Sequence, residues 1–262
     1  PELGEWMANV VDTDDPLINS AMRKLRRQRE RAVRIPTRLV RALSEAANEG
    51  FAAWMEAKEA KDFSRFEPHL ERLVGLRCEQ VSHLGPAAHP YDHLLDEYDP
   101  GARTADLKPL FTRLSGELSD FIQSIEGRPS PDPLDQHFDI PGQEWLSRQV
   151  LDRLGFRMRD GRLDLSAHPF TVSMGPSDVR LTTRYHENDL LSGLGGTIHE
   201  GGHGMYEQGL PVRWHGTWLD EAAGMAMHES QSRFWENTIG RSEPFCQWLC
   251  TLIQQRWPEK DI

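Results

Sequence analysis

The chain has 262 residues, of which 38% are hydrophobic, a content that supports a folded core and excludes wholesale disorder. Its formal net charge of -11 makes a nucleic-acid backbone an unfavourable partner. The apolar runs are shorter than the ~20 residues needed to cross a bilayer, so we expect no transmembrane helix and no membrane partner.

Helical periodicity dominates the first half of the chain. The residue before Pro36 avoids the helical region, so a break at Ile35-Pro36 separates the first two helices. Ser64 is expected to cap a third helix, with Glu67 completing a capping box. The prolines between Gly127 and Gly142 predict a loop. The expected helices cover approximately 17–33, 39–58, 64–84, 104–122 and 143–154.

The second half mixes strands with helices. Residues 156–165 and 179–185 have strand-like composition and predict a small antiparallel sheet. Asn188 or Asp189 is expected to cap a helix that runs to about Gln208, followed by helices over roughly 219–239 and 242–257. The sequence therefore predicts a mainly α fold with one domain over 1–262. Within it, 1–154 is the helical part and 155–262 is the part that carries the site.

The cysteines and the start of the chain bear on location. Three cysteines do not make a disulfide framework. No basic segment followed by an apolar one opens the chain. We therefore expect a cytoplasmic protein.

The strongest chemical signal is the run His199-Glu200-Gly201-Gly202-His203. Histidines four residues apart on a helix lie on one face and can bind one zinc ion. Glu200 points away from them, where it can act as general base on a metal-bound water. A catalytic zinc needs a third protein ligand, and Glu229 on the next predicted helix is the best candidate. Glu221, His228 and Glu236 compete for that role, and Glu221 and His228 can instead orient the ligand imidazoles.

Two further features lie close to this motif. Five glycines surround it, and they predict the close approach of another backbone, either a neighbouring helix or a bound peptide. The segment from Asp178 to Tyr185 alternates in polarity. As an edge strand it can bind an extended peptide, with Arg180 or Arg184 pairing with a carboxylate, or it can be a plain salt-bridged strand.

Four ordered motifs resemble those of the carboxypeptidase Taq family of metallocarboxypeptidases. They are His168-Pro169-Phe170, the D-x-R-x-T run from Asp178 to Thr182, His199 to His203, and His228-Glu229-Ser230-Gln231. The resemblance implies a helical, zincin-like fold with a small sheet beside the active-site helix. It also implies a homodimer that releases C-terminal amino acids from peptides.

By the same resemblance, His199, His203 and Glu229 bind zinc, with cobalt as an alternative, and Glu200 activates the water. The expected substrate-binding residues are Arg180, Arg184, His168 and His228. Arg213 and Arg233 are further candidates for gripping a terminal carboxylate.

The chain also departs from the family. It lacks the later I/N-R-x-x-A/S-D and G-x-x-Q-D-x-H-W motifs, which are expected to hold the substrate carboxylate and the oxyanion. We therefore expect a compact member with substitute residues, a member completed by a partner, or a fragment. Two alternatives to a carboxypeptidase stay open: an oligopeptidase or endopeptidase, and a catalytically crippled zinc-binding protein.

Overall fold

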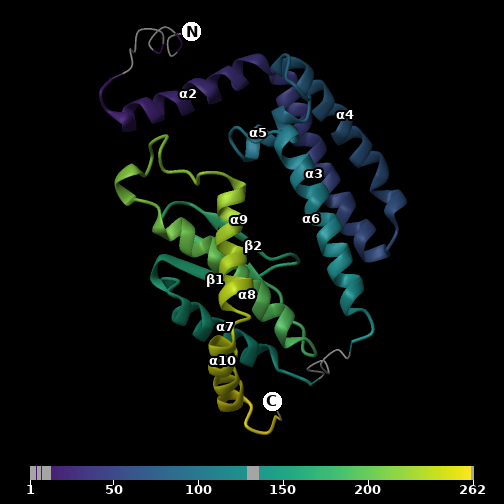
Figure 1. Cartoon of the computed structure of the whole chain (residues 1–262), viewed down its shortest axis with the longest axis vertical. Helices are drawn as coiled ribbons and strands as arrows, with labels where there is room; N and C mark the ends of the chain where they lie inside the picture. Colours follow the sequence, from purple (N-terminus) through teal and green to yellow (C-terminus); the bar gives the residue numbers. More distant parts are fainter. Residues whose placement is uncertain (1–3, 5–6, 8–12, 129–135, 261–262) are drawn as a thin grey trace. The chain divides into compact units, whose positions relative to one another are not determined.

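The computed structural model describes residues 4, 7, 13–128 and 136–260. The chain divides into two compact units, residues 1–118 and residues 119–262. Helices dominate both units (Figure 1), which confirms the predicted mainly α class. The single domain over 1–262 stays a prediction, because a division by contacts does not decide how many units fold independently.

The first unit contains only helices among its described residues. α2 begins after Asp15, whose carboxylate accepts a hydrogen bond from the Leu17 amide at 2.8 Å. It ends before Pro36, as the sequence predicts. The helical elements are α2 (Pro16–Arg34), α3 (Thr37–Ala60), the 3-10 turn η1 (Phe63–Arg65), α4 (Glu67–Leu84), α5 (Asp92–Tyr98) and α6 (Thr104–Ile125), and α6 runs on into the second unit.

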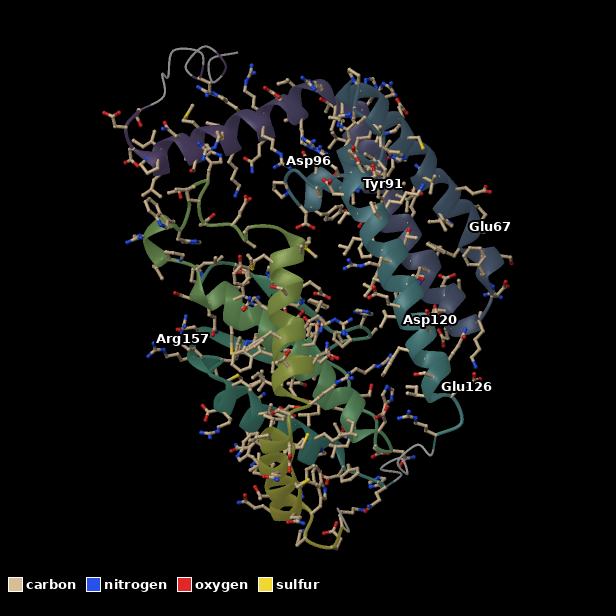
Figure 2. All side chains as sticks on the ribbon, viewed as in Figure 1. Glu67, Tyr91, Asp96, Asp120, Glu126 and Arg157 are labelled. Atoms are coloured by element: carbon tan, nitrogen blue, oxygen red, sulfur yellow. The ribbon has the colours of Figure 1, made fainter. Side chains whose placement is uncertain are left out.

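Close packing and several ion pairs hold the helices of this unit together. α3 and α4 meet at Gly50, where a Cβ atom would lie 3.3 Å from the Leu73 side chain. α5 is tied to α2 by an ion pair of 2.8 Å between Arg27 and Asp96, the latter labelled in Figure 2. The expected Ser64 cap is wrong. Asp62 instead accepts the Ser64 amide at 3.2 Å and starts η1, so α4 begins only at Glu67. None of the described helices combines the length and the hydrophobicity needed to cross a membrane.

In the second unit one long helix, α8, packs against a small sheet and against neighbouring helices (Figure 1). Its elements are α7 (Ile140–Leu154), the 3-10 turn η2 (Met158–Asp160), β1 (Gly161–Leu165), β2 (Phe170–Ser173), β3 (Val179–Thr183), α8 (Leu190–Gly209), the 3-10 turn η3 (Val212–Trp214), α9 (Met225–Arg233), the π-helical segment η4 (Phe234–Ile239) and α10 (Glu243–Arg256).

The predicted small sheet is present, but it is mixed rather than antiparallel. The strand order is β1-β3-β2, with β1 parallel and β2 antiparallel to β3. The difference arises from β2, which the sequence analysis did not assign. Residues 170–173 form the hairpin partner of β3, so β1 must take the opposite edge of β3 and runs parallel to it. β3 is therefore the central strand, and the expectation that residues 178–185 form an edge strand is wrong.

Two apolar clusters pack against α8 and support the site. The first joins α7, α8 and α10, and its buried members are Phe138, Leu146, Val150, Leu190, Leu194, Ile198, Phe245, Leu249, Ile253 and Trp257. The second joins α7 to the sheet, and its buried members are Leu151, Phe156, Leu163, Val179 and Leu181. Because these interiors are close-packed, α8 has little freedom to rotate or slide.

The helix predicted over roughly 219–239 is shorter than expected. It begins at Met225 because Gly224 has a φ of 151°, which no helical residue adopts. It then widens into the π-helical segment η4 at Phe234. Such widened turns occur often at functional sites. Here the segment carries Glu236, which contacts the histidine motif.

Candidate metal centre

Two histidines of α8 lie on one face of that helix. α8 begins after Asp189, whose carboxylate accepts a hydrogen bond from the Ser192 amide at 3.0 Å. The rings of His199 and His203 follow one turn apart, with their centroids separated by 4.9 Å. The local rules of helix geometry therefore produce the pair without help from the rest of the fold.

Glu229 of α9 completes a group of three donors. Its Oε2 lies 3.0 Å from Nε2 of His203 and 3.7 Å from Nε2 of His199. These three side chains are the one group within 13–128 and 136–260 whose donor atoms come together, all within 4.8 Å of one another. Two imidazoles and one carboxylate are the donor set of many catalytic zinc sites, where a water takes the fourth position. The residues present therefore fit such an ion.

The outward-facing nitrogens of both imidazoles have partners as well. Nδ1 of His199 lies 2.9 Å from Oε2 of Glu236. Nδ1 of His203 lies 2.5 Å from Nδ1 of His228, whose Nε2 is 2.7 Å from Oε1 of Glu207. These contacts orient both rings, which leaves Nε2 as the nitrogen turned toward Glu229. Burial, followed by the neighbouring His228, lowers the pKa of His203 and favours the neutral form that binds metals.

Glu200 lies beside the donor group but does not belong to it. Its carboxylate accepts a hydrogen bond from the Thr171 hydroxyl of β2 at 2.7 Å, and the residue is only 6% exposed. Burial raises the pKa of Glu200, and the Thr171 hydrogen bond partly opposes that rise. A carboxylate with a raised pKa next to a metal donor set has the properties of a general base.

A glycine allows α9 to approach α8 closely enough to bring Glu229 into the group. A Cβ atom on Gly202 would lie 2.7 Å from Cα of Ser232 and 2.9 Å from the carbonyl oxygen of Gln231. The expected close approach of a neighbouring helix at the motif is thus confirmed. Ser232 is fully buried, and its hydroxyl lies 3.0 Å from Oε2 of Glu229, which orients the carboxylate.

The other candidates for the third ligand, Glu236, His228 and Glu221, lie outside the donor group. Glu236 lies on the far side of the His199 ring, where it also meets Arg233 at 3.3 Å. His228 lies behind His203, in the orienting position that the sequence analysis offered as its alternative. Glu221 is not a member of the donor group.

The expected substrate-binding residues Arg180, Arg184 and His168 differ in their contacts. Arg180 forms a bidentate ion pair with Asp178, with N–O distances of 2.9 and 2.7 Å. Arg184 donates to the carbonyl oxygen of Ala167 at 3.4 Å and is exposed. His168 follows Ala167 and is close enough for its charge to influence the pKa of Glu200. Their roles in substrate binding stay predictions.

Three residues of the site were not found from the sequence. Thr171 lies on the unassigned strand β2, Glu207 lies one turn beyond the histidine motif, and Ser232 lies one turn after Glu229. The i, i+4 spacing of His203 and Glu207 is a signal that could have placed Glu207 near the motif. No local pattern marks Thr171, because its partner is 29 residues away.

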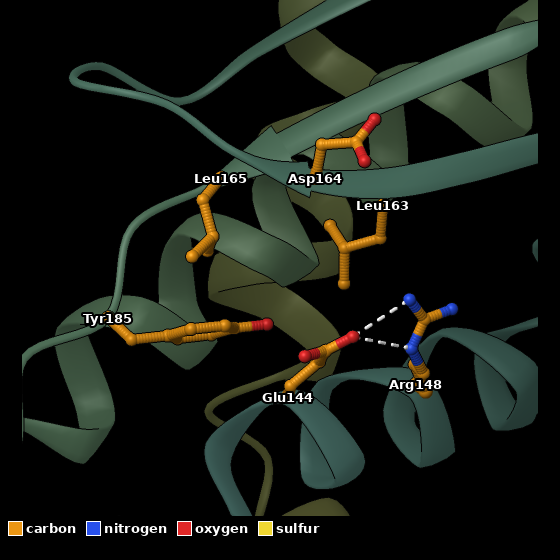
Figure 3. Close-up of a pocket in the computed structure, with 6 residues that line it drawn as sticks. All are labelled: Glu144, Arg148, Leu163, Asp164, Leu165 and Tyr185. Atoms are coloured by element: carbon orange, nitrogen blue, oxygen red, sulfur yellow. Dashed lines mark hydrogen bonds and ion pairs between the residues drawn. The ribbon is translucent and has the colours of Figure 1, made fainter. Parts of the chain in front are cut away.

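A separate pocket lies between α7 and β1. It has a volume of about 220 Å³ and is lined by Glu144, Arg148, Leu163, Asp164, Leu165 and Tyr185. Figure 3 shows the guanidinium of Arg148 turned toward the carboxylate of Glu144, at 2.9 and 3.2 Å. The pocket contains no member of the donor group, so we assign it no part in the chemistry of that group.

Comparison with known proteins gives a consistent result. Residues 2–261 match the sequence model of the carboxypeptidase Taq (M32) metallopeptidases. The chain is 39% identical to thermostable carboxypeptidase 1 of Thermus thermophilus, over 94% of this chain and 51% of that protein. It is also 39% identical to carboxypeptidase 1 of Bacillus subtilis, over 80% of this chain and 43% of that protein.

Solved structures agree with the sequence comparisons. A carboxypeptidase structure from Pyrococcus furiosus superimposes with a TM-score of 0.90 at 34% identity, covering 99% of this chain and 54% of that one. The M32 carboxypeptidase of Deinococcus radiodurans gives a TM-score of 0.86 at 33% identity, covering 96% and 51%. The chain therefore spans about half the length of the relatives that it matches.

Proposed function

The chain belongs to the carboxypeptidase Taq (M32) metallopeptidase family, and we propose that it acts as a metallocarboxypeptidase that releases C-terminal amino acids from peptides. The single observation that carries the proposal is the meeting of His199, His203 and Glu229 beside a buried Glu200. The first three residues are the proposed metal ligands. A His/His/Glu set favours catalysis over a purely structural zinc site, because structural sites are usually closed and rich in cysteine.

Zinc is the proposed metal, with cobalt as an alternative, since imidazole and carboxylate ligands suit both ions. When bound, such an ion makes a water molecule more acidic and polarises the scissile carbonyl. The second effect also stabilises the negative charge that develops on the carbonyl oxygen. The transfer of the proton requires a residue of the chain that lies beside the ligands without being one of them.

Glu200 is the proposed general base. Its carboxylate takes a proton from the attacking water as the new C–O bond forms, and it gives that proton to the amine as the C–N bond breaks. The Thr171 hydroxyl holds one carboxylate oxygen at 2.7 Å, which leaves the other oxygen for the water. The raised pKa of Glu200 favours the first transfer, because it makes this carboxylate a stronger base toward the attacking water than an exposed carboxylate.

β2 is the strand beside which we place the substrate. Within the three-stranded sheet it pairs with β3 alone, and Thr171 links it to Glu200. An extended peptide can add to such an edge by main-chain hydrogen bonds. Of the two arginines of β3 and its end, Arg184 is the better candidate for the terminal carboxylate. Arg180 is already engaged by Asp178, whereas Arg184 makes one long bond to the loop that carries His168.

Peptides with blocked ends test the proposal. The zinc-loaded chain is incubated with an N-blocked peptide and with its C-amidated counterpart, and the products are identified by mass spectrometry. A carboxypeptidase cleaves the first peptide and spares the second. Internal cleavage of both would favour the oligopeptidase or endopeptidase alternative, and no cleavage would favour a crippled zinc-binding protein.

Three variants connect the activity to the residues. Glu200→Gln keeps the size of the side chain but removes the base, so we expect it to bind zinc as the parent does and to lose most turnover. Arg184→Gln is expected to raise KM for free C-termini more than Arg180→Gln does.

The homodimer stays a proposal, and the molar mass in solution, measured by light scattering, tests it.

A further inference from the structure

The two proposed ligand histidines are oriented in different ways. Nδ1 of His199 contacts a carboxylate directly, that of Glu236 at 2.9 Å. Nδ1 of His203 contacts another imidazole nitrogen, Nδ1 of His228, at 2.5 Å. A carboxylate can only accept a hydrogen bond, whereas a neutral imidazole nitrogen either donates or accepts. The orientation of His203 therefore depends on which nitrogen of His228 carries the proton.

Glu207 determines which nitrogen of His228 carries the proton, because it contacts the far side of the His228 ring. Its Oε1 lies 2.7 Å from Nε2 of His228, and both side chains are largely buried, at 14% and 17% exposed. The hydrogen bond from His228 lowers the pKa of Glu207, so the carboxylate is ionised and acts as an acceptor. The proton of a neutral His228 then lies on Nε2, and its Nδ1 is left with a lone pair.

We propose that Glu207 is a positioning residue of the metal centre, acting through His228 to keep Nδ1 of His203 a donor and Nε2 of His203 a metal ligand. The chain of contacts runs from the Glu207 carboxylate to His228 Nε2–H, and from His228 Nδ1 to His203 Nδ1–H. The proposal rests on the metal site of the proposed function. It adds a residue that is not a member of the donor group.

The packing around His228 supports this arrangement. The rings of His203 and His228 lie with centroids 4.6 Å apart. Tyr206 meets the His228 ring edge-on, with centroids 5.2 Å apart and an interplanar angle of 89°. The Tyr206 hydroxyl in turn accepts the Ala223 amide at 3.2 Å. His228 is thus held in its plane and cannot easily swing to offer another atom to His203.

Loss of Glu207 has a definite consequence in this geometry. Without an acceptor at Nε2, His228 is free to carry its proton on Nδ1, where it faces Nδ1 of His203 at hydrogen-bond distance. His203 must then accept with Nδ1, which moves its own proton to Nε2, the nitrogen that faces Glu229 at 3.0 Å. A protonated Nε2 cannot bind a metal ion. His203 must therefore change its tautomer before it binds, and the free energy of that change weakens metal binding.

The test measures zinc affinity by competition with a chromogenic chelator, with zinc alone as the ligand. Glu207→Leu is expected to weaken zinc binding by roughly 10–100-fold, as for other residues that orient a metal-binding histidine. Glu236→Leu, which removes the partner of His199, is the positive control. Glu243→Gln on the exposed start of α10 is the negative control. Thermal midpoints in the presence of chelator show that each variant folds.

A rescue variant separates orientation from a structural role. In His228→Asn the amide oxygen accepts from His203 Nδ1–H without any help from Glu207. Adding Glu207→Leu to His228→Asn is therefore expected to change the zinc Kd by no more than a factor of about two, the spread within which independent effects add. Adding Glu236→Leu to His228→Asn retains its full effect. A purely structural Glu207 would weaken binding equally in both backgrounds, and that result would overturn the proposal.

A spectroscopic measurement reads the proton directly. In the zinc-loaded parent, ¹⁵N NMR of the histidines is expected to show His228 protonated at Nε2 and unprotonated at Nδ1. A proton on Nδ1 of His228, or an unchanged Kd in Glu207→Leu, refutes the role of Glu207 while the proposed function stands. A parent that binds zinc but cleaves no peptide refutes the proposed function and leaves the role of Glu207 intact. A parent that binds no zinc refutes both.

Discussion

The contact between α8 and α9 at Gly202 gives a prediction whose size follows from the structure. A Cβ atom there would lie 2.7 Å from Cα of Ser232, whereas ordinary contacts begin at 3.4 Å. In Gly202→Ala the two helices must therefore separate by about 0.7 Å, the difference of these distances, because both sides of the contact are backbone. Overpacking of this kind costs about 1–3 kcal/mol.

The same helix offers a matched control. A Cβ atom on Gly195 would meet nothing within 4 Å, so Gly195→Ala brings only the gain in helix propensity, about 1 kcal/mol. Both variants share that gain, so the difference between them isolates the contact with Ser232. We expect Gly202→Ala to be less stable than Gly195→Ala by about 1–3 kcal/mol, as measured by urea unfolding of the metal-free protein.

The separation also reaches the proposed ligands. Glu229 is three residues before Ser232, and zinc sites tolerate errors of only about 0.2 Å in ligand distance. Gly202→Ala should therefore weaken zinc binding, while Gly195→Ala should not. Equal stability and equal zinc affinity in the two variants would refute the argument that the glycine sets the distance between α8 and α9.

The remaining predictions concern carboxyl groups. A hydrogen bond from the Trp257 indole, then the Gly142 amide and Arg256, lowers the pKa of Asp139. The stability from this group is therefore present above its unfolded pKa of 3.8 and is lost as pH falls through the folded value, and thermal midpoints of Asp139→Asn should lack that step. Burial raises the pKa of Glu200, so Glu200→Gln should stabilise the metal-free protein at pH 7, and the gain should vanish as pH falls below 4.5, the ordinary value of the carboxyl group. Thr171→Val removes a bond that lowers the pKa of Glu200, so the acidic limb of the kcat/KM profile should move to higher pH.

These predictions test different parts of the structure, so one of them can fail while the others hold. The Asp139 variant tests how the start of α7 is joined to the end of α10, through bonds of 2.7 Å from both Arg256 and Trp257. The Glu200 and Thr171 variants test the environment of the proposed base. A pH profile that does not move in Thr171→Val would show that Glu200 does not set the acidic limb.

Local chemistry made much of the molecule predictable. The boundaries of α2 and α8 follow from Asp15, Pro36 and Asp189, which act within a few residues of where they stand. The four-residue spacing of His199 and His203 places both rings on one helix face whatever surrounds the helix. The sequence by itself therefore determined the helical class, the histidine pair and the separate position of Glu200.

Non-local packing decided the rest. Thr171 reaches Glu200 only because a four-residue strand pairs with β3 and lies along α8, and so short a strand leaves little pattern to detect. The choice of Glu229 over Glu236 depends on how closely α9 approaches α8 at Gly202. Partners of this kind are fixed by the distance between elements far apart in the chain, and neither spacing nor composition encodes that distance. Only the tertiary structure could therefore bring Thr171 to Glu200 and seat Ser232 against Gly202 of α8.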